Sequence, residues 1–170
     1  MKKLLKIVGG LLAAICLVII LFAAWYVYQF YPRHAEAFQV GNPQATQKFL
    51  IATQGSEFKN TVVDRLVKLY ENQDVFLRII DVSSLETISA EHWSGIAILN
   101  TSIADQINSD VQVFLERTGK SETIVMITTS GGGDFVPPDL QVDGITTASR
   151  LTETETLARR IYKKFKGPEI

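Results

Sequence analysis

The feature that most constrains this chain is the run at residues 7–28, IVGGLLAAICLVIILFAAWYVY, which contains no charged side chain. A helix needs about 20 apolar residues to cross a hydrocarbon core of roughly 30 Å, and this run is long enough. Aromatic side chains gather at and after its end, as in the aromatic belts of membrane interfaces: Trp25, Tyr26, Tyr28, Phe30 and Tyr31. The sequence therefore predicts that residues 7–28 cross a membrane as a helix and contact lipid.

Positive charge is concentrated before this segment. Lys2, Lys3 and Lys6 precede it, whereas Arg33 and the weakly basic His34 follow it. Basic residues beside a membrane helix favour the cytoplasmic side. We therefore expect a single-pass protein of the cell membrane with a cytoplasmic N-terminus and an extracytoplasmic domain, as in a bacterial envelope.

A cleaved signal peptide is the alternative, because it also begins with a basic region and an apolar core. Its apolar region has about 7–15 residues and ends at a small-residue cleavage site. Here the apolar run is longer, and the small pair Ala23 and Ala24 is followed by bulky Trp25 and Tyr26. These features favour an uncleaved anchor.

The sequence divides into a basic start and anchor at residues 1–31, a tether at 32–47 and one domain at 48–170. The tether is inferred from its weak periodicity and from Gly41, Asn42 and Pro43. The single cysteine, Cys16, lies in the anchor, so the domain must fold without a disulfide. A net charge of −1 gives no electrostatic footprint for nucleic-acid binding.

Apolar strand patterns alternate with helical ones along the domain. The predicted strands lie at residues 49–52, 75–80, 94–99, 123–128 and 142–148. The predicted helices lie at residues 57–71, 105–117 and 152–166, with one helical turn within 83–92. Strands that are apolar nearly throughout need cover on both faces. We therefore predict an α/β fold in which a doubly wound, five-stranded parallel sheet forms the middle of three layers.

Three strand ends, AILNTS, IVMITTSGGG and VDGITTASR, resemble those of the flavodoxin-like family, and the resemblance covers residues 48–166. It implies the strand order 2-1-3-4-5 and loops that bind FMN non-covalently after the first, third and fourth strands. The residues that it places in these loops are Thr53, Gly55, Ser56, Thr61, Asn100, Thr101, Ser130, Gly131, Gly132, Gly133 and Phe135.

The first of these loops has a physical reason to hold a phosphate. Gly55 permits close approach of the backbone, nearby hydroxyls can donate, and the following helix begins with unpaired N–H groups. The alternative is that Gly55 turns the chain and Ser56 caps the helix. Glu57 would repel a phosphate unless its side chain points away.

The later loops carry less specific signals. Residues 100–105 contain no aromatic side chain to stack on a flavin, and Phe135 is the aromatic residue of the next loop. Gly131–Gly133 either bring backbone amides to a flavin edge or form a flexible loop before Pro137 and Pro138. Residues 143–149 loosely resemble a site of covalent flavin attachment, with Ser149 as the acceptor. The alternative there is a strand end that leads into a helix capped by Thr152.

The sequence contains few of the residue patterns that hydrolases and metal sites require. It lacks a Gly-x-Ser-x-Gly elbow, a His-Glu-x-x-His helix and a phosphate-binding Gly-x-x-x-x-Gly-Lys-Ser/Thr loop. Its two histidines, His34 and His92, lie away from the predicted ligand edge. We therefore predict no metal site and no catalytic residue.

Two functional hypotheses follow. The first is a membrane-anchored protein that binds FMN and passes electrons to a redox partner that the sequence does not identify. The second is a cofactor-free binding or scaffold domain of the same fold on the outer face of the membrane, because a fold does not fix a function.

Overall fold

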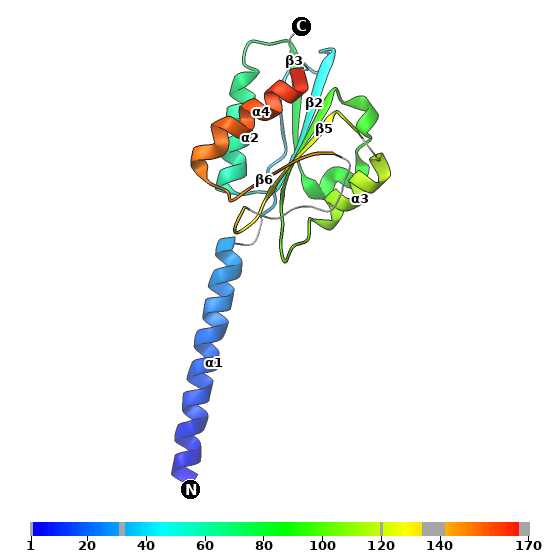
Figure 1. The fold of residues 1–170 in the computed structure, drawn as a ribbon. Helices are drawn as coiled ribbons and strands as arrows, with labels where there is room; N and C mark the ends of the chain where they lie inside the picture. Colours follow the sequence, from blue (N-terminus) through cyan, green and yellow to red (C-terminus); the bar gives the residue numbers. More distant parts are fainter. Residues whose placement is uncertain (1, 31–32, 120, 134–141, 167–170) are drawn as a thin grey trace. The chain divides into compact units, whose positions relative to one another are not determined.

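The computed structural model describes residues 2–30, 33–119, 121–133 and 142–166, and the chain forms two units, Met1–Pro32 and Arg33–Ile170 (Figure 1). The first unit consists of helix α1 (Lys2–Phe30). The side chains of Lys6–Tyr28 are exposed, and this part is long and apolar enough to cross a membrane. A signal sequence at this position has the same features.

The second unit is built on a mixed, six-stranded sheet. Its strands are β1 (Phe38–Gly41), β2 (Gln47–Thr53), β3 (Val75–Asp81), β4 (Gly95–Thr101), β5 (Ile124–Thr129) and β6 (Asp143–Thr147). They lie in the order β1-β3-β2-β4-β5-β6; β1 is antiparallel to β3 and the other pairs are parallel. The described residues of this unit also form the α-helices α2 (Glu57–Leu69), α3 (Ser109–Thr118) and α4 (Thr154–Lys166) and the 3-10 helices η1 (Val82–Thr87), η2 (Ala90–His92) and η3 (Leu151–Glu153).

The predicted α/β class is confirmed, and the predicted strands and helices form close to the expected positions. The predicted five-stranded, all-parallel sheet is not what forms, because the sheet has a sixth, antiparallel strand. The five parallel strands alone lie in the order β3-β2-β4-β5-β6. Their central members are apolar on both faces because helices cover both, as the sequence pattern indicates.

The additional strand β1 lies in the segment that the sequence analysis assigns to a tether. Val40 pairs with Leu77 of β3, and Gly41 adopts a φ of 89° where the strand ends. Farther along, Ala45 is buried in the domain. Residues 33–46 therefore belong to the domain, which their sequence does not reveal because β1 has only four residues and most of it is exposed.

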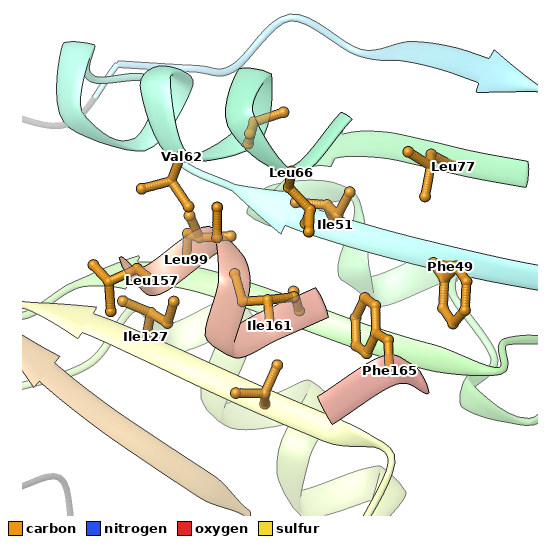
Figure 2. Close-up of a cluster of buried hydrophobic side chains, with 14 of the residues drawn as sticks. Phe49, Ile51, Val62, Leu66, Leu77, Leu99, Ile127, Leu157, Ile161 and Phe165 are labelled. Carbon is orange, nitrogen blue, oxygen red and sulfur yellow. The ribbon is translucent and has the colours of Figure 1, made fainter. Parts of the chain in front are cut away.

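One face of the sheet packs against α2 and α4 (Figure 1). The ring of Phe49 stacks on Phe165 with centroids 4.8 Å apart and an interplanar angle of 4°. Figure 2 shows this layer, in which side chains of alternate strand positions meet the apolar stripes of both helices: Ile51, Leu77, Leu99, Ile127, Val62, Leu66, Leu157 and Ile161. The period of two in the strands and of 3.6 in the helices makes this contact continuous.

The opposite face packs against α3 and η1. Leu50, Ile96 and Ile98 point to this side and lie in one buried cluster with Phe114 of α3. The guanidinium group of Arg117 donates hydrogen bonds to the carbonyl oxygens of Leu85, Glu86 and Ile88, at 3.0, 2.7 and 2.8 Å. These bonds hold the end of α3 against η1.

Candidate functional site

The strand order indicates the edge of the sheet at which a ligand would bind. β3 lies on one side of β2, whereas β4, β5 and β6 lie on the other, so the order reverses between β2 and β4. In open α/β sheets, ligands bind outside the carboxyl ends of the strands where the order reverses. We call this place the switch point; Thr53 ends β2 there and Thr101 ends β4.

The hydroxyl groups predicted to hold a phosphate in the first loop bond to the backbone of the loop or of the first turns of α2. Thr53 Oγ1 donates to the carbonyl oxygen of Gln54 at 3.2 Å, and Thr61 Oγ1 donates to that of Glu57 at 2.8 Å. Ser56 is the N-cap of α2, and its Oγ accepts from Lys59 N at 3.2 Å. Ser56 therefore has the capping role that the sequence analysis gives as the alternative.

Residues 33–35, which we call the strap, lie across this loop. Gly55 N donates to Arg33 O at 2.6 Å, and Arg33 N donates to Gly55 O at 3.1 Å. A Cβ at position 55 would lie 2.5 Å from His34 O and 2.9 Å from Arg33 O. Gly55 is thus needed for close approach of the backbone, but the group that approaches is the chain itself.

Asp81 anchors the other end of the strap. Its carboxylate accepts from Ala35 N at 2.7 Å and from Ser83 N at 3.0 Å, and His34 Nδ1 lies 3.3 Å from Oδ1. Burial raises the pKa of Asp81, but these hydrogen bonds outweigh burial and leave the pKa below its ordinary value. The strap is therefore bonded both to the loop after β2 and to the end of β3.

Two side chains cross the switch point to Thr101. Gln54 Oε1 accepts a hydrogen bond from Thr101 N at 2.6 Å, and Lys59 Nζ donates to Thr101 Oγ1. Thr101 Oγ1 lies 3.2 Å from Thr129 Oγ1, which donates to Asn100 O at 3.2 Å. Lys59 is 2% exposed, and burial lowers its pKa to about 8.

The side chain of Asn100 lies on the other face of the same edge. Its Oδ1 accepts from Asn108 N at 3.2 Å. Its Nδ2 is buried without a hydrogen-bond partner in the part of the chain that the structure describes, as is Oγ1 of Thr128, the residue opposite it on β5. Asn100 and Thr101 therefore face opposite sides of the sheet and do not form one site.

The glycine loop after β5 is partly closed by its own contacts. Ser130 Oγ accepts from Gly133 N at 2.9 Å, and Gly133 has a φ of 79°. Gly131 and Gly132 are exposed. Phe135, Pro137 and Pro138 lie outside the described residues.

The end of β6 differs from the predicted helix cap. The 3-10 helix η3 follows it, and α4 begins at Thr154, whose Oγ1 donates to Leu151 O at 2.7 Å. Thr147 Oγ1 donates to the Glu153 carboxylate, and Ser149 has a φ of 57°. Thr152 is thus inside η3 and is not the N-cap of α4.

Sequence reasoning missed Lys59, although a signal for it was present. With Val62, Val63 and Leu66, Lys59 occupies positions i, i+3, i+4 and i+7 of α2, which make up one buried stripe. A lysine in line with an apolar stripe lies on the buried face of its helix, so its ammonium group is either buried or extended to solvent; in Lys59 it is buried. The strap had no such signal, because its bonds to Gly55 and Asp81 join residues far apart in the sequence.

A separate pocket lies at the opposite edge of the sheet, beside the amino end of β3. Its volume is about 350 Å³, and its apolar lining includes Val40, Val67, Val75 and Leu77. This pocket does not lie at the switch point. In the described ranges, no group of three His, Cys, Asp or Glu side chains is placed to hold a metal ion.

No protein-family model matches the chain, and no curated protein is similar to it. Among solved structures, the metal-soaked Flv1 flavodiiron core from Synechocystis sp. PCC6803 is weakly similar, with 15% sequence identity and a TM-score of 0.47. The match covers 73% of this chain and 37% of that chain. The chain thus spans well under half the length of that structure.

Proposed function

We propose that this chain is a membrane-anchored, flavodoxin-like binding protein whose domain takes a ligand or partner other than FMN. The flavodoxin-like part is supported by the order of the parallel strands, β3-β2-β4-β5-β6, which corresponds to 2-1-3-4-5. The anchor is supported by the exposed apolar side chains of Lys6–Tyr28. The lysines before it favour a cytoplasmic N-terminus and an extracytoplasmic domain.

The observation that carries this proposal is the pair of hydrogen bonds between Gly55 and Arg33. A phosphate at the start of a helix is held by N–H groups that point at it. Gly55 N instead points at Arg33 O, and the carbonyl oxygens of Arg33 and His34 lie against Gly55. Because carbonyl oxygens present negative partial charge, the first loop does not fit the phosphate of FMN.

The charge at the switch point argues in the same direction. Among the described residues, the buried cation at this edge is Lys59. One ammonium group balances one negative charge, whereas a phosphate monoester carries nearly two. We therefore assign the switch point to a ligand with less negative charge than a phosphate monoester.

The alternative is a non-covalent FMN electron carrier with a redox partner. The exposed backbone at Gly131 and Gly132 favours it, because a flavin edge can approach glycine closely. In that case the ring would bind at the later loop and the phosphate would have to displace the strap.

An FMN-retention assay separates these two functions. The full-length chain, purified in detergent, is incubated with excess FMN and passed through gel filtration, with a flavodoxin as positive control. We expect a colourless protein. A flavin absorption spectrum that elutes with the chain would reject the binding function and support electron transfer.

The membrane topology has its own test. Alkaline phosphatase is active only where disulfides form, outside the cytoplasm. We expect a C-terminal fusion of this enzyme to be active in bacterial cells and to remain in the membrane fraction. An inactive fusion would contradict the proposed orientation, and activity released as a soluble protein would show cleavage of α1.

A further inference from the structure

Lys59 is a buried ammonium group without a counter-charge among the described residues. It is 2% exposed, and its one hydrogen-bond acceptor in that part of the chain is the hydroxyl group of Thr101. An ammonium group has three N–H donors, and a neutral hydroxyl group cannot balance its charge. Buried charges in proteins are normally paired with an opposite charge.

The position of this group is that of a ligand-binding residue. Lys59 comes from the first turn of α2, which follows β2, and it reaches Thr101 at the end of β4. Its Nζ therefore lies at the switch point, where ligands of doubly wound sheets bind. Thr101 is half-buried, whereas Lys59 and Thr129 are buried, so a ligand would have to reach Nζ from the side of Thr101.

Hydroxyl groups extend the site beyond Lys59. Thr101 Oγ1 and Thr129 Oγ1 lie 3.2 Å apart, and Thr129 pairs in register with Thr147 of β6. The three threonines point to the same face of the sheet because residues opposite each other on neighbouring strands do so. Thr129 Oγ1 already donates to Asn100 O, so the second donor for an oxyanion beside Lys59 would be Thr101, whose hydroxyl hydrogen would turn from Thr129 Oγ1 to the anion.

The charge of the surroundings selects the class of anion. Among the described residues of the site, Lys59 is the one buried cation; Arg33 and Glu57 are exposed, and Glu153 lies 3.8 Å from the guanidinium group of Arg150. One ammonium group balances a single carboxylate but not a phosphate dianion. A singly charged oxyanion is therefore the better match.

We propose that Lys59 and Thr101, with Thr129 behind them, form a binding site for a small monocarboxylate at the switch point. The carboxylate accepts a charge-assisted hydrogen bond from Lys59 Nζ and a second bond from the Thr101 hydroxyl group. This inference rests on the proposed binding function and gives its ligand a chemical class. The lowered pKa of the free amine agrees with it, because a bound carboxylate would raise that pKa again.

The test is a titration of the full-length chain in detergent at pH 7 with sodium acetate, with sodium chloride and phosphate at matched ionic strength for comparison. The readouts are the thermal unfolding midpoint and the NMR signals of the Lys59 side chain. We expect a saturable rise in the midpoint and a saturable shift of the Lys59 signals with acetate alone. The same titration of Lys59→Met should show affinity reduced by about tenfold or more, because a charged hydrogen-bond partner is lost.

Two further variants complete this test. Lys68→Met removes an exposed lysine from the same helix and should bind acetate like the wild type. Thr101→Val should weaken binding less than Lys59→Met does. Equal acetate binding by the wild type and Lys59→Met, tighter binding of phosphate at Lys59, or unshifted Lys59 signals in the wild type would each overturn the site.

If Lys59→Met fails to fold, the NMR signals of Lys59 in the wild type still show whether acetate binds at this residue. Failure of this inference is also distinct from failure of the proposed function. A colourless protein that does not bind acetate would reject only the carboxylate site. Retained FMN would reject the binding function whether or not acetate binds.

Discussion

Gly55 and Arg33 are joined by two backbone hydrogen bonds, Gly55 N to Arg33 O at 2.6 Å and Arg33 N to Gly55 O at 3.1 Å. They form an isolated antiparallel bridge between the strap and the loop after β2. Gly55 is the residue of this loop whose backbone is best suited to approach a phosphate, and it is instead bonded to the segment that follows α1.

The substitution Gly55→Ala should destabilise the domain. The new methyl group would lie 2.5 Å from His34 O, which is backbone and cannot rotate away, so the strap must shift. Overpacking of this kind costs about 1–3 kcal/mol. Urea unfolding of the full-length chain in detergent measures the loss. Gly131→Ala is the matched control, since nothing lies within 4 Å of its added Cβ; equal stability of both variants would contradict the bridge.

The carboxylate of Asp81 should make stability fall in acid. Its pKa is lower in the folded state than in the unfolded chain, so its contribution is present above the unfolded value of about 3.9 and declines as the pH falls through the folded value. Asp81→Asn should lose about 1–2 kcal/mol at pH 7 through its bonds to the strap. Unfolding free energies from pH 7 down to about pH 3 check this. If Asp81→Asn lost as much stability in acid as the wild type, the role of the Asp81 carboxylate in holding the strap would be contradicted.

The ammonium group of Lys59 should make stability rise with pH in the alkaline range. Burial lowers its pKa from 10.5 to about 8, so the unfolded chain binds the proton more tightly. The free energy of unfolding should therefore rise between about pH 8 and pH 10.5, by at most about 3 kcal/mol. Lys59→Met should be more stable than the wild type at pH 7 in chloride buffer, and this difference should shrink at pH 10. Lys68→Met is the control, and an identical pH profile for both variants would count against burial of the charge.

The guanidinium group of Arg117 should not be replaceable by lysine. It donates to the carbonyl oxygens of Leu85, Glu86 and Ile88 at once, which an ammonium group on a flexible stem does not reproduce. We expect Arg117→Lys to lose about 1–2 kcal/mol of unfolding free energy. Arg150→Lys, at an exposed residue, should change stability by less than about 0.5 kcal/mol. A loss no larger than that of the control would contradict the role of Arg117.

The elements that the sequence predicts well have complete local signals. β2, β4 and β5 are runs of apolar residues with both faces covered, and α2 and α4 carry apolar stripes of helical period. Such patterns follow from burial alone. They therefore predict the layers of the domain without knowledge of its contacts.

The parts that the sequence does not predict depend on contacts between distant segments. β1 is short and mostly exposed, and only its pairing with β3 makes it a strand. Thr53, Gly55 and Ser56 have the composition of a phosphate loop. Whether their groups face a ligand depends on the strap, because Arg33 occupies the amide of Gly55. The same residue types thus serve a ligand loop or a closed turn, and composition does not distinguish them.

Amide hydrogen exchange at Gly55 in the full-length chain, with and without FMN, shows whether the strap closes the first loop. We expect slow exchange in both conditions, because Arg33 O accepts from this amide whether or not the flavin is present. Fast exchange that becomes slow only when FMN is added would show that the Gly55 amide is free to bind a phosphate, and the strap would then not exclude FMN.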